Sequence, residues 1–242
     1  MFKRRQKSLP EPGFPTLSGA HYQHVISALE QSLNPEWYLE IGSRTGSSLA
    51  RRHCNFIAID PEFQLEGDVL NGARSFVFRQ ETSDDFFASG YLERNEIKPK
   101  LAFIDGMHLF EFALRDFINL ERAMAPGGVI CVHDVCPFNR AMTTRDTGYL
   151  RHKLPWTGDV WKLVHILRTL RPDLNLRVLN ASSTGLAVIS GLAPDSKTLS
   201  EEYDSLVARY EPATLDDFGV AEVFELFSLD DADAFIQSLR GA

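Results

Sequence analysis

Acidic residues and histidines stand directly after several apolar runs of the sequence, where buried strands are expected to end. Glu40, Asp60, Asp105 and the pair His133-Asp134 occupy four such positions. In a parallel sheet, ligands bind beyond the carboxyl ends of the strands. Carboxylate and imidazole groups gathered there can hold an amino group, the hydroxyls of a sugar or a metal cation. The sequence therefore predicts a site for a polar or cationic ligand.

The stretch Trp37–Asp60 has the order strand, glycine turn, helix, strand and acid that is typical of a nucleotide-binding βαβ unit. The turn carries Gly42 and Gly46, and a short helical segment follows to about Arg52. The glycines let the backbone approach a ligand closely, and the helix N-terminus offers unpaired N–H groups. The acid at the end, Asp60, lies 18 positions after Gly42, where its carboxylate can accept hydrogen bonds from both hydroxyls of a ribose.

The turn narrows the class of ligand. A dinucleotide site needs the pattern G-x-G-x-x-G because a pyrophosphate sits against the helix end. This turn is G-x-x-x-G, and Glu40 precedes it. A carboxylate at that point would repel a pyrophosphate, but it suits a ligand with an amino group and a sulfonium. A tight turn without a ligand and an NAD-type site remain the alternatives here.

The pattern E-x-G-x-x-x-G-x-S, formed by Glu40, Gly42, Gly46 and Ser48, resembles motif I of class I S-adenosylmethionine (SAM)-dependent methyltransferases. The resemblance implies SAM as the cofactor. Two polar residues just after the third strand occupy the position that commonly contacts adenine in that fold, although they suit a helix N-cap equally well. The expected cofactor-binding residues are Glu40, Gly42, Ser43, Arg44, Gly46, Ser48, Asp60, Thr82 and Ser83.

Apolar runs alternate with amphipathic segments, which predicts an α/β fold. The last two strands are joined closely through Ala181-Ser182-Ser183, which favours an antiparallel hairpin. Five strands separated by helices and then a hairpin match the Rossmann-like class I methyltransferase sheet, which is seven-stranded and mostly parallel with helices on both faces. Strands are expected at 37–41, 55–59, 74–79, 101–104, 129–132, 175–179 and 184–190, and helices at 20–33, 82–94, 109–124 and 159–170.

Two further segments sharpen the resemblance. Phe103–Glu111 (FIDGMHLFE) and Pro126–Asp134 (PGGVICVHD) look like the macrocin O-methyltransferase and cephalosporin hydroxylase group of this fold. They are similar, more distantly, to catechol-type O-methyltransferases. The resemblance covers about residues 35–190 and implies O-methylation of a small hydroxylated molecule.

The same resemblance implies roles for four residues. The positions that match Asp105 and the pair His133-Asp134 hold Mg²⁺ in those relatives, and the position that matches His108 supplies a general base. Asp105 and His108 are therefore the expected catalytic residues. A histidine at position 133 departs from the usual acid or amide, so a His–carboxylate set would suit Mn²⁺, Fe²⁺ or Zn²⁺ better than Mg²⁺, or the site holds no metal.

The segment 137–158 lacks periodicity and has a basic bias, and long loops of this kind are usually functional. Arg140 and Arg145 in it suggest an acceptor with a carboxylate, a phosphate or an acidic sugar. At the start of the next helix, Trp161 and Lys162 either face the pocket or belong to a plain core helix capped by Asp159. On the long helix 109–124, Glu111 and Asp116 are interpreted as structural.

With 242 residues, 44% hydrophobic and 24% charged, the chain has an ordinary globular composition and can form one α/β domain. No apolar run approaches the roughly 18 residues that span a bilayer. No apolar segment follows the basic N-terminus as in a secretory signal. Three cysteines without a paired framework indicate free thiols in the cytoplasm.

The net charge of −8 is concentrated in residues 191–242, which carry 12 acidic and three basic residues. The rest of the chain is nearly neutral, which argues against a nucleic-acid binder. We expect a mobile basic arm at 1–19, a SAM-binding domain at 20–190, and an acidic extension at 191–242 that packs on the core or on a second subunit of a homo-oligomer. The extension has a helix near 199–210, a strand-like Val223–Phe227 and a last helix from about Leu229.

These observations together predict a SAM-dependent O-methyltransferase of a small molecule. An NAD(P)-linked oxidoreductase is the first alternative, against which the missing third glycine and the closing hairpin count. A SAM-binding module without catalysis is the second alternative, against which the retention of Asp105 and His108 counts.

Overall fold

Alternate residues of the buried strands supply two hydrophobic cores, one on each face of the central sheet. The structure is a computed structural model that describes residues 10–70, 72–148 and 155–240. In the strand Trp37–Ile41, Leu39 and Ile41 pack into one core and Tyr38 packs into the other. Because successive side chains of a strand point to opposite faces, strands that are apolar throughout need helices on both sides.

The central sheet has seven strands in the order β4-β3-β2-β5-β6-β9-β7. Neighbouring strands are parallel except at β9, which runs antiparallel to β6 and to β7. The predicted mostly parallel sheet with an antiparallel end is confirmed. The strands are β1 (Gly19–His21), β2 (Trp37–Ile41), β3 (Asn55–Ile59), β4 (Phe76–Arg79), β5 (Leu101–Ile104), β6 (Val129–His133), β7 (Asn175–Leu179), β8 (Ala181–Ser182) and β9 (Leu186–Ser190), of which β1 and β8 form a separate two-stranded sheet.

The order of the strands reverses between β2 and β5. The chain runs outward from β2 through β3 to β4, and then returns to place β5 on the other side of β2. Connections that leave the sheet in opposite directions open a crevice at the carboxyl ends of such a strand pair. The fold thus creates a binding site beyond β2 and β5.

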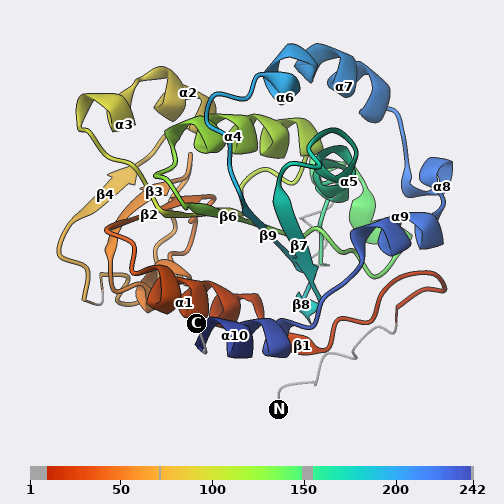
Figure 1. The fold of residues 1–242 in the computed structure, drawn as a ribbon, viewed down its shortest axis with the longest axis horizontal. Helices are drawn as coiled ribbons and strands as arrows, with labels where there is room; N and C mark the ends of the chain where they lie inside the picture. Colours follow the sequence, from red (N-terminus) through yellow and green to blue (C-terminus); the bar gives the residue numbers. More distant parts are fainter. Residues whose placement is uncertain (1–9, 71, 149–154, 241–242) are drawn as a thin grey trace.

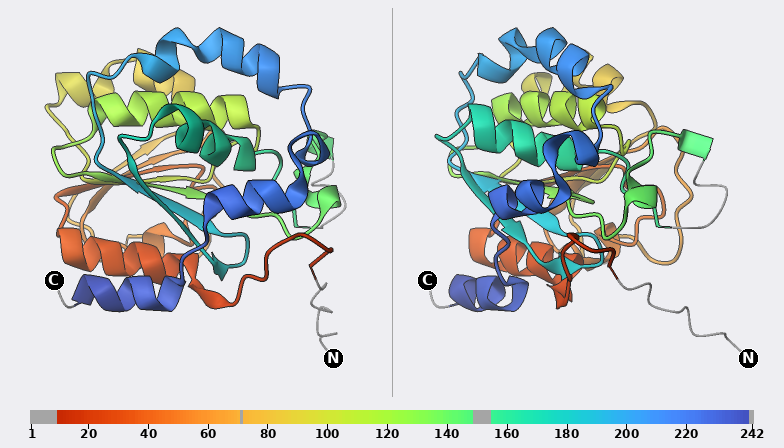
Figure 2. Two further views of the ribbon diagram at one scale, coloured as in Figure 1. Left: turned by 45° about the vertical axis from the view of Figure 1, so that its right-hand side comes forward. Right: turned by 90° about the vertical axis from the view of Figure 1, so that its right-hand side faces the viewer.

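Helices cover both faces of the sheet, as predicted. Figures 1 and 2 show α1 and α10 side by side on one face, α4 and α5 on the other, and α6 and α7 as an outer layer over α4. The helices are α1 (Tyr22–Leu33), α2 (Ser83–Ala88), α3 (Tyr91–Arg94), α4 (Phe110–Ala123), α5 (Trp161–Leu170), α6 (Thr198–Glu201), α7 (Tyr203–Tyr210), α8 (Leu215–Phe218), α9 (Val220–Phe227) and α10 (Ala232–Arg240), with 3-10 turns η1 (Leu49–Arg51) and η2 (Arg140–Thr143).

Three segments differ from the sequence predictions. The helical segment after the glycine turn is only the 3-10 turn η1. The region 82–94 contains two helices, because Gly90 adopts a φ of +62° between α2 and α3. The prediction of a strand at Val223–Phe227 is wrong, since this segment belongs to α9. Apolar residues at 220, 223, 224 and 227 have helical spacing and are all buried, so the longer period prevails.

Both ends of the described chain pack against the core. Of the predicted arm, residues 1–9 lie outside the described residues. Phe14 is buried and its ring contacts that of Phe224, so residues 10–18 are held by an apolar contact instead of extending freely. In the acidic extension, Tyr210 and Phe227 are buried in the core of the same chain. Among the described helices, none has the length and apolar character needed to cross a bilayer.

Candidate active site

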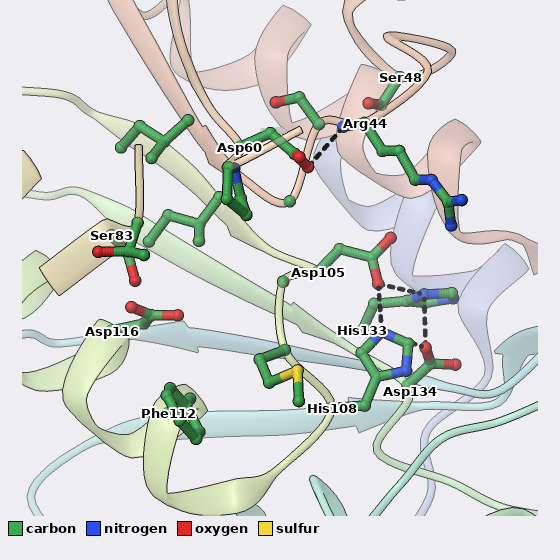
Figure 3. Close-up of a pocket in the computed structure, with 18 of the residues that line it drawn as sticks. Arg44, Ser48, Asp60, Ser83, Asp105, His108, Phe112, Asp116, His133 and Asp134 are labelled. Carbon is green, nitrogen blue, oxygen red and sulfur yellow. Dashed lines mark hydrogen bonds and ion pairs between the residues drawn. The ribbon is translucent and has the colours of Figure 1, made fainter. Parts of the chain in front are cut away.

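A cavity of about 610 Å³ lies at the carboxyl ends of β2, β3, β5 and β6. The four predicted catalytic and metal-binding residues, Asp105, His108, His133 and Asp134, all line it (Figure 3). So do most of the predicted cofactor-binding residues, namely Gly42, Ser43, Arg44, Ser48, Asp60, Thr82 and Ser83.

The glycine turn is pressed against the end of β5. Gly42 has a φ of +89°, and a Cβ atom there would lie 2.1 Å from the carbonyl oxygen of Asp105. Gly46 has a φ of +73°, and a Cβ there would lie 2.5 Å from Cγ1 of Val69. Both backbone positions therefore need glycine, for conformation and for space. Gly46 supports the turn from outside the cavity lining.

Glu40 lies beneath the turn and not in the cavity lining. Its carboxylate accepts hydrogen bonds from the hydroxyl of Tyr38 (2.6 Å) and from Oγ of Ser48 (2.5 Å). Burial raises the pKa of Glu40, while the two hydroxyl donors act against that rise. The acid of the sequence pattern thus ties β2 to the segment after the turn.

Asp60 ends β3 and points into the cavity. Its Oδ2 accepts a hydrogen bond from the backbone N–H of Arg44 (2.9 Å), and its Oδ1 accepts one from that of Glu62 (2.8 Å). These two bonds fix the carboxylate beside the turn, as Figure 3 shows for Arg44. Each oxygen keeps a second lone pair for a ligand hydroxyl.

Ser43 offers the cavity a buried hydroxyl. Its Oγ has no hydrogen-bond partner among the described residues. A buried polar atom without a partner costs free energy, so an orphan that lines a cavity is suited to a ligand atom. The fit of the turn to a nucleoside ligand with polar ends is supported by this atom and by the close approach at Gly42.

Acidic groups outnumber basic groups in the lining of the cavity. Its carboxylates belong to Asp60, Asp84, Asp105, Asp116 and Asp134, against the guanidinium of Arg44 and the imidazoles of His108 and His133. This balance favours a cationic ligand and disfavours a pyrophosphate. Charge therefore supports the sulfonium interpretation of the turn against the NAD-type one.

Thr82 has the N-cap role that the sequence left open. Its Oγ1 accepts a hydrogen bond from the backbone N–H of Asp85 (3.1 Å) at the start of α2. Ser83 lines the cavity and lies near Asp116 (Figure 3). The interpretation of Asp116 as structural needs revision, because this residue also lines the cavity.

Two histidines and two aspartates converge at the ends of β5 and β6. Nε2 of His108 lies 3.2 Å from Oδ2 of Asp134 and 3.6 Å from Oδ1 of Asp105. Nδ1 of His133 lies 3.1 Å from the same Asp105 oxygen. Burial acts to raise the pKa of Asp105, but the two imidazoles outweigh it and lower that pKa to about 2. The four groups thus form one charged cluster (Figure 3).

His108 presents one ring nitrogen to the cluster, because the other is fixed from behind. Its Nδ1 lies 2.9 Å from the carbonyl oxygen of Trp156 and can only donate to it. The backbone of the same segment docks nearby, with the N–H of Asp159 bonded to the carbonyl of His108 (3.1 Å). Burial alone would lower the pKa of His108, but Asp134 and Asp105 raise it to about 9.

His133 has both ring nitrogens engaged. Besides Nδ1 toward Asp105, its Nε2 lies 3.2 Å from the hydroxyl of Thr184. The ring of Tyr22 packs on the imidazole with a centroid distance of 3.9 Å. Burial would lower the pKa of His133, and Asp134 and Asp105 raise it. His133 is thereby held as a wall of the cluster.

The ligand atoms that lie close enough for one cation belong to Asp105, His108 and Asp134, all within 4.8 Å of one another. The sequence had grouped His133 with the two aspartates and had assigned His108 to proton transfer. In the structure the nitrogen of His108 faces both carboxylates, so the same atom is suited to either task. A metal-binding histidine typically donates its other N–H to a carbonyl, as His108 does.

In the described part of the basic loop, Arg140 and Arg145 are both paired with carboxylates and do not line the cavity. Arg140 pairs with Asp216 (2.7 Å) and Glu11 (3.1 Å). Arg145 pairs with Glu111 (2.7 Å) and Asp159 (2.6 Å). The expectation that these arginines select an acidic acceptor is not supported, because each guanidinium is already paired with two carboxylates of the same chain.

The start of α5 belongs to the core. Trp161 and Lys162 are buried and do not line the cavity. Lys162 is paired with Asp159 (2.7 Å), whose other oxygen accepts the backbone N–H of Phe110 (2.8 Å). Asp159 therefore caps α4, and the prediction that it caps α5 is wrong, because α5 begins after Val160 without a side-chain cap.

Comparison with known proteins agrees with this geometry. Residues 39–135 match the family described as methyltransferase domain. The match, with the fold, confirms the predicted class of a SAM-dependent methyltransferase and gives no support to an oxidoreductase. No curated protein matches the chain.

Several solved structures are similar to this chain. The O-methyltransferase of Bacillus cereus in complex with SAH is 15% identical, with 73% of this chain and 84% of that chain covered and a TM-score of 0.49. The O-methyltransferase TomG of Streptomyces achromogenes, involved in tomaymycin synthesis and in complex with SAM, is 17% identical (73% and 82%, 0.46). A putative hemolysin of Streptococcus thermophilus is 14% identical (78% and 76%, 0.42). Likenesses this low carry no conclusion about the substrate.

The matched range 39–135 contains every predicted site residue. Residues outside this range contact the two histidines of the His–Asp cluster. Tyr22 on α1, Trp156 before α5 and Thr184 before β9 contact the two histidines. The sequence patterns do not predict a role for Tyr22 or Thr184. A tyrosine at the start of a helix and a threonine in a hairpin carry no local pattern that separates them from ordinary surface residues.

Proposed function

We propose that the protein transfers the methyl group of SAM to a hydroxyl group of a small molecule. The observation that carries the proposal is one cavity that is lined by the turn at Gly42, by Asp60 and by His108. A donor held at the first two groups would have its reactive end near the third. No structure of the acceptor is implied by the paired arginines of the loop.

The donor half of the site fits SAM by charge and by hydrogen bonding. Bound SAM supplies an electrophilic methyl group on a sulfonium. Asp60 orients the ribose through its remaining lone pairs, and Oγ of Ser43 donates to the amino-acid end of the donor. The acidic lining stabilises the positive charge of the donor.

The acceptor half centres on His108. In its neutral form, which predominates above the pKa of about 9, His108 accepts the proton of the acceptor hydroxyl at Nε2, while the carbonyl of Trp156 holds Nδ1 and so fixes the direction of the ring. Asp105 and Asp134 stabilise the imidazolium that forms. Positioning of both reactants accounts for much of the expected acceleration.

The same three groups suit a divalent cation, in which case Nε2 of His108 is a ligand. A cation held by Asp105, His108 and Asp134 would lower the pKa of an acceptor hydroxyl. One nitrogen and two carboxylates favour Mn²⁺, Fe²⁺ or Zn²⁺ over Mg²⁺. The two roles of His108 make different predictions for a chelator.

The test combines donor binding with methyl transfer to a library of hydroxylated small molecules. We expect the wild type to bind SAM and S-adenosylhomocysteine (SAH) but not NAD, and His108→Gln to lose at least about 100-fold in transfer with SAH affinity retained. If activity survives treatment with a chelator, the role of His108 is proton transfer. If the chelator abolishes activity and Mn²⁺ or Zn²⁺ restores it, the role of His108 is metal binding. Failure of the wild type to bind SAH, or to methylate any acceptor, would overturn the proposal.

A further inference from the structure

Asp116 is a buried acid that the proposed transfer does not use. It lies on the α4 face toward the cavity and is only 3% exposed. Its Oδ1 has no hydrogen-bond partner among the described residues. An unpaired carboxylate oxygen inside a protein is costly, so a partner supplied by a ligand would explain its retention.

The position of Asp116 is defined by the other labelled residues of the cavity. In Figure 3, Asp116 lies beside Ser83 and Phe112, on the side of Asp60 opposite to His108, His133 and Asp134. A donor whose ribose meets Asp60 must point its sulfonium toward His108. Its base then extends the other way, toward Ser83 and Asp116.

We propose that Asp116 recognises the adenine ring of the donor, by accepting a hydrogen bond from the 6-amino group and pairing with N1. This inference rests on the proposed function. Phe112 lies one helical turn before Asp116 and lines the same part of the cavity, where its ring can cover a face of the base. Ser83 completes the polar edge.

The protonation of Asp116 agrees with this assignment. Burial raises the pKa of Asp116 to about 7, although a hydrogen bond from Ser83 acts to lower it. A protonated carboxyl group has a donor beside an acceptor. The edge of adenine has the complementary pair, the acceptor N1 beside the donor 6-amino group. Near neutral pH the side chain can therefore satisfy both atoms.

The experiment is a comparison of ligand and protein changes by calorimetry. SAH, its 6-deamino analogue and its 1-deaza analogue are titrated into wild type, Asp116→Leu and Asp116→Asn. In the wild type we expect each analogue to bind about 10-fold more weakly than SAH, because a buried polar group loses its partner. In Asp116→Leu the three ligands should bind within about 2-fold of one another, since nothing remains to distinguish them.

Two controls separate recognition from folding. Asp116→Asn keeps a donor and an acceptor in the same shape, so it should retain the preference for SAH. Glu81→Gln changes a nearby acid that does not line the cavity and whose carboxylate is paired with Arg79 (2.6 Å), and it should leave the preference unchanged. Both controls use the full chain.

The outcomes distinguish this inference from the proposed function. If the wild type does not bind SAH, the proposed function fails. If the wild type binds SAH and both analogues equally, only the role of Asp116 fails, and this result needs no variant to fold. Retention of the SAH preference in Asp116→Leu would also overturn the inference.

Discussion

Gly42 and Asp105 come from adjacent strands and meet backbone to backbone, so that a Cβ atom on Gly42 would lie 2.1 Å from the carbonyl oxygen of Asp105. The glycine turn and the cluster of Asp105, His108, His133 and Asp134 are therefore in direct contact. The backbone of Asp105 contacts the turn, and the side chain of the same residue belongs to the cluster. A change at the turn should consequently affect both halves of the site.

Gly42→Ala should lower the free energy of unfolding by at least about 3 kcal/mol, because a positive φ and a clash with backbone act together. The matched control is Gly67→Ala, which has a φ of +73° but no atom within 4 Å of an added Cβ. That variant should lose only about 1 kcal/mol. Urea unfolding measures both, and equal losses would contradict the close contact.

Asp116→Asn should stabilise the ligand-free protein at alkaline but not at acidic pH. The folded pKa of about 7 lies above the ordinary value of 3.8, so the folded state holds its proton longer than the unfolded state. Wild-type stability then falls as the pH rises from about 4 to 7, by roughly 4 kcal/mol at most, and the asparagine variant escapes this loss. Unfolding curves of both proteins across this range give the difference, which should level off above pH 7. A constant difference would show that Asp116 is ionised throughout.

Asp60→Ala should weaken SAH binding by at least about 100-fold, since two charge-assisted hydrogen bonds to the ribose are lost. Asp68→Ala, in the exposed part of the following loop, provides a matched acidic control with unchanged affinity. Titration calorimetry measures both, and circular dichroism checks that the fold is intact. Unchanged affinity in a folded Asp60→Ala would exclude this carboxylate from the donor site.

Glu121→Gln should destabilise the protein by about 2 kcal/mol, because the guanidinium of Arg171 loses its buried charged partner and keeps only the exposed carboxylate of Asp173. Arg171 is 2% exposed and Glu121 5% exposed. The exposed pair Arg177–Asp230 is the comparison, and Asp230→Asn should cost less than about 1 kcal/mol. Chemical denaturation distinguishes the two, and similar losses would show that burial does not decide the cost.

The sequence predicts the strands and the strand-end acids well, because both follow from local patterns. Apolar runs end before Asp60 and Asp105 whatever the rest of the chain does. The pairing of Arg140 could not be predicted, since its partners Glu11 and Asp216 lie far away in sequence. The tie between His133 and Thr184 is equally non-local, because β9 must first pair with β6 to bring the hydroxyl within reach.

The docking of residues 156–159 onto His108 and Phe110 has a consequence for how this enzyme could diversify. Three hydrogen bonds join the two segments, from the Trp156 carbonyl, the Asp159 N–H and the Asp159 carboxylate. The direction of the His108 imidazole is thus set by the segment 156–159, which precedes α5. Residues 142–145 are themselves tied to this anchor, because the carbonyl of Thr144 accepts a hydrogen bond from Nε1 of Trp156 and Arg145 pairs with Asp159, so an exchange of this loop would change the direction of the His108 ring as well.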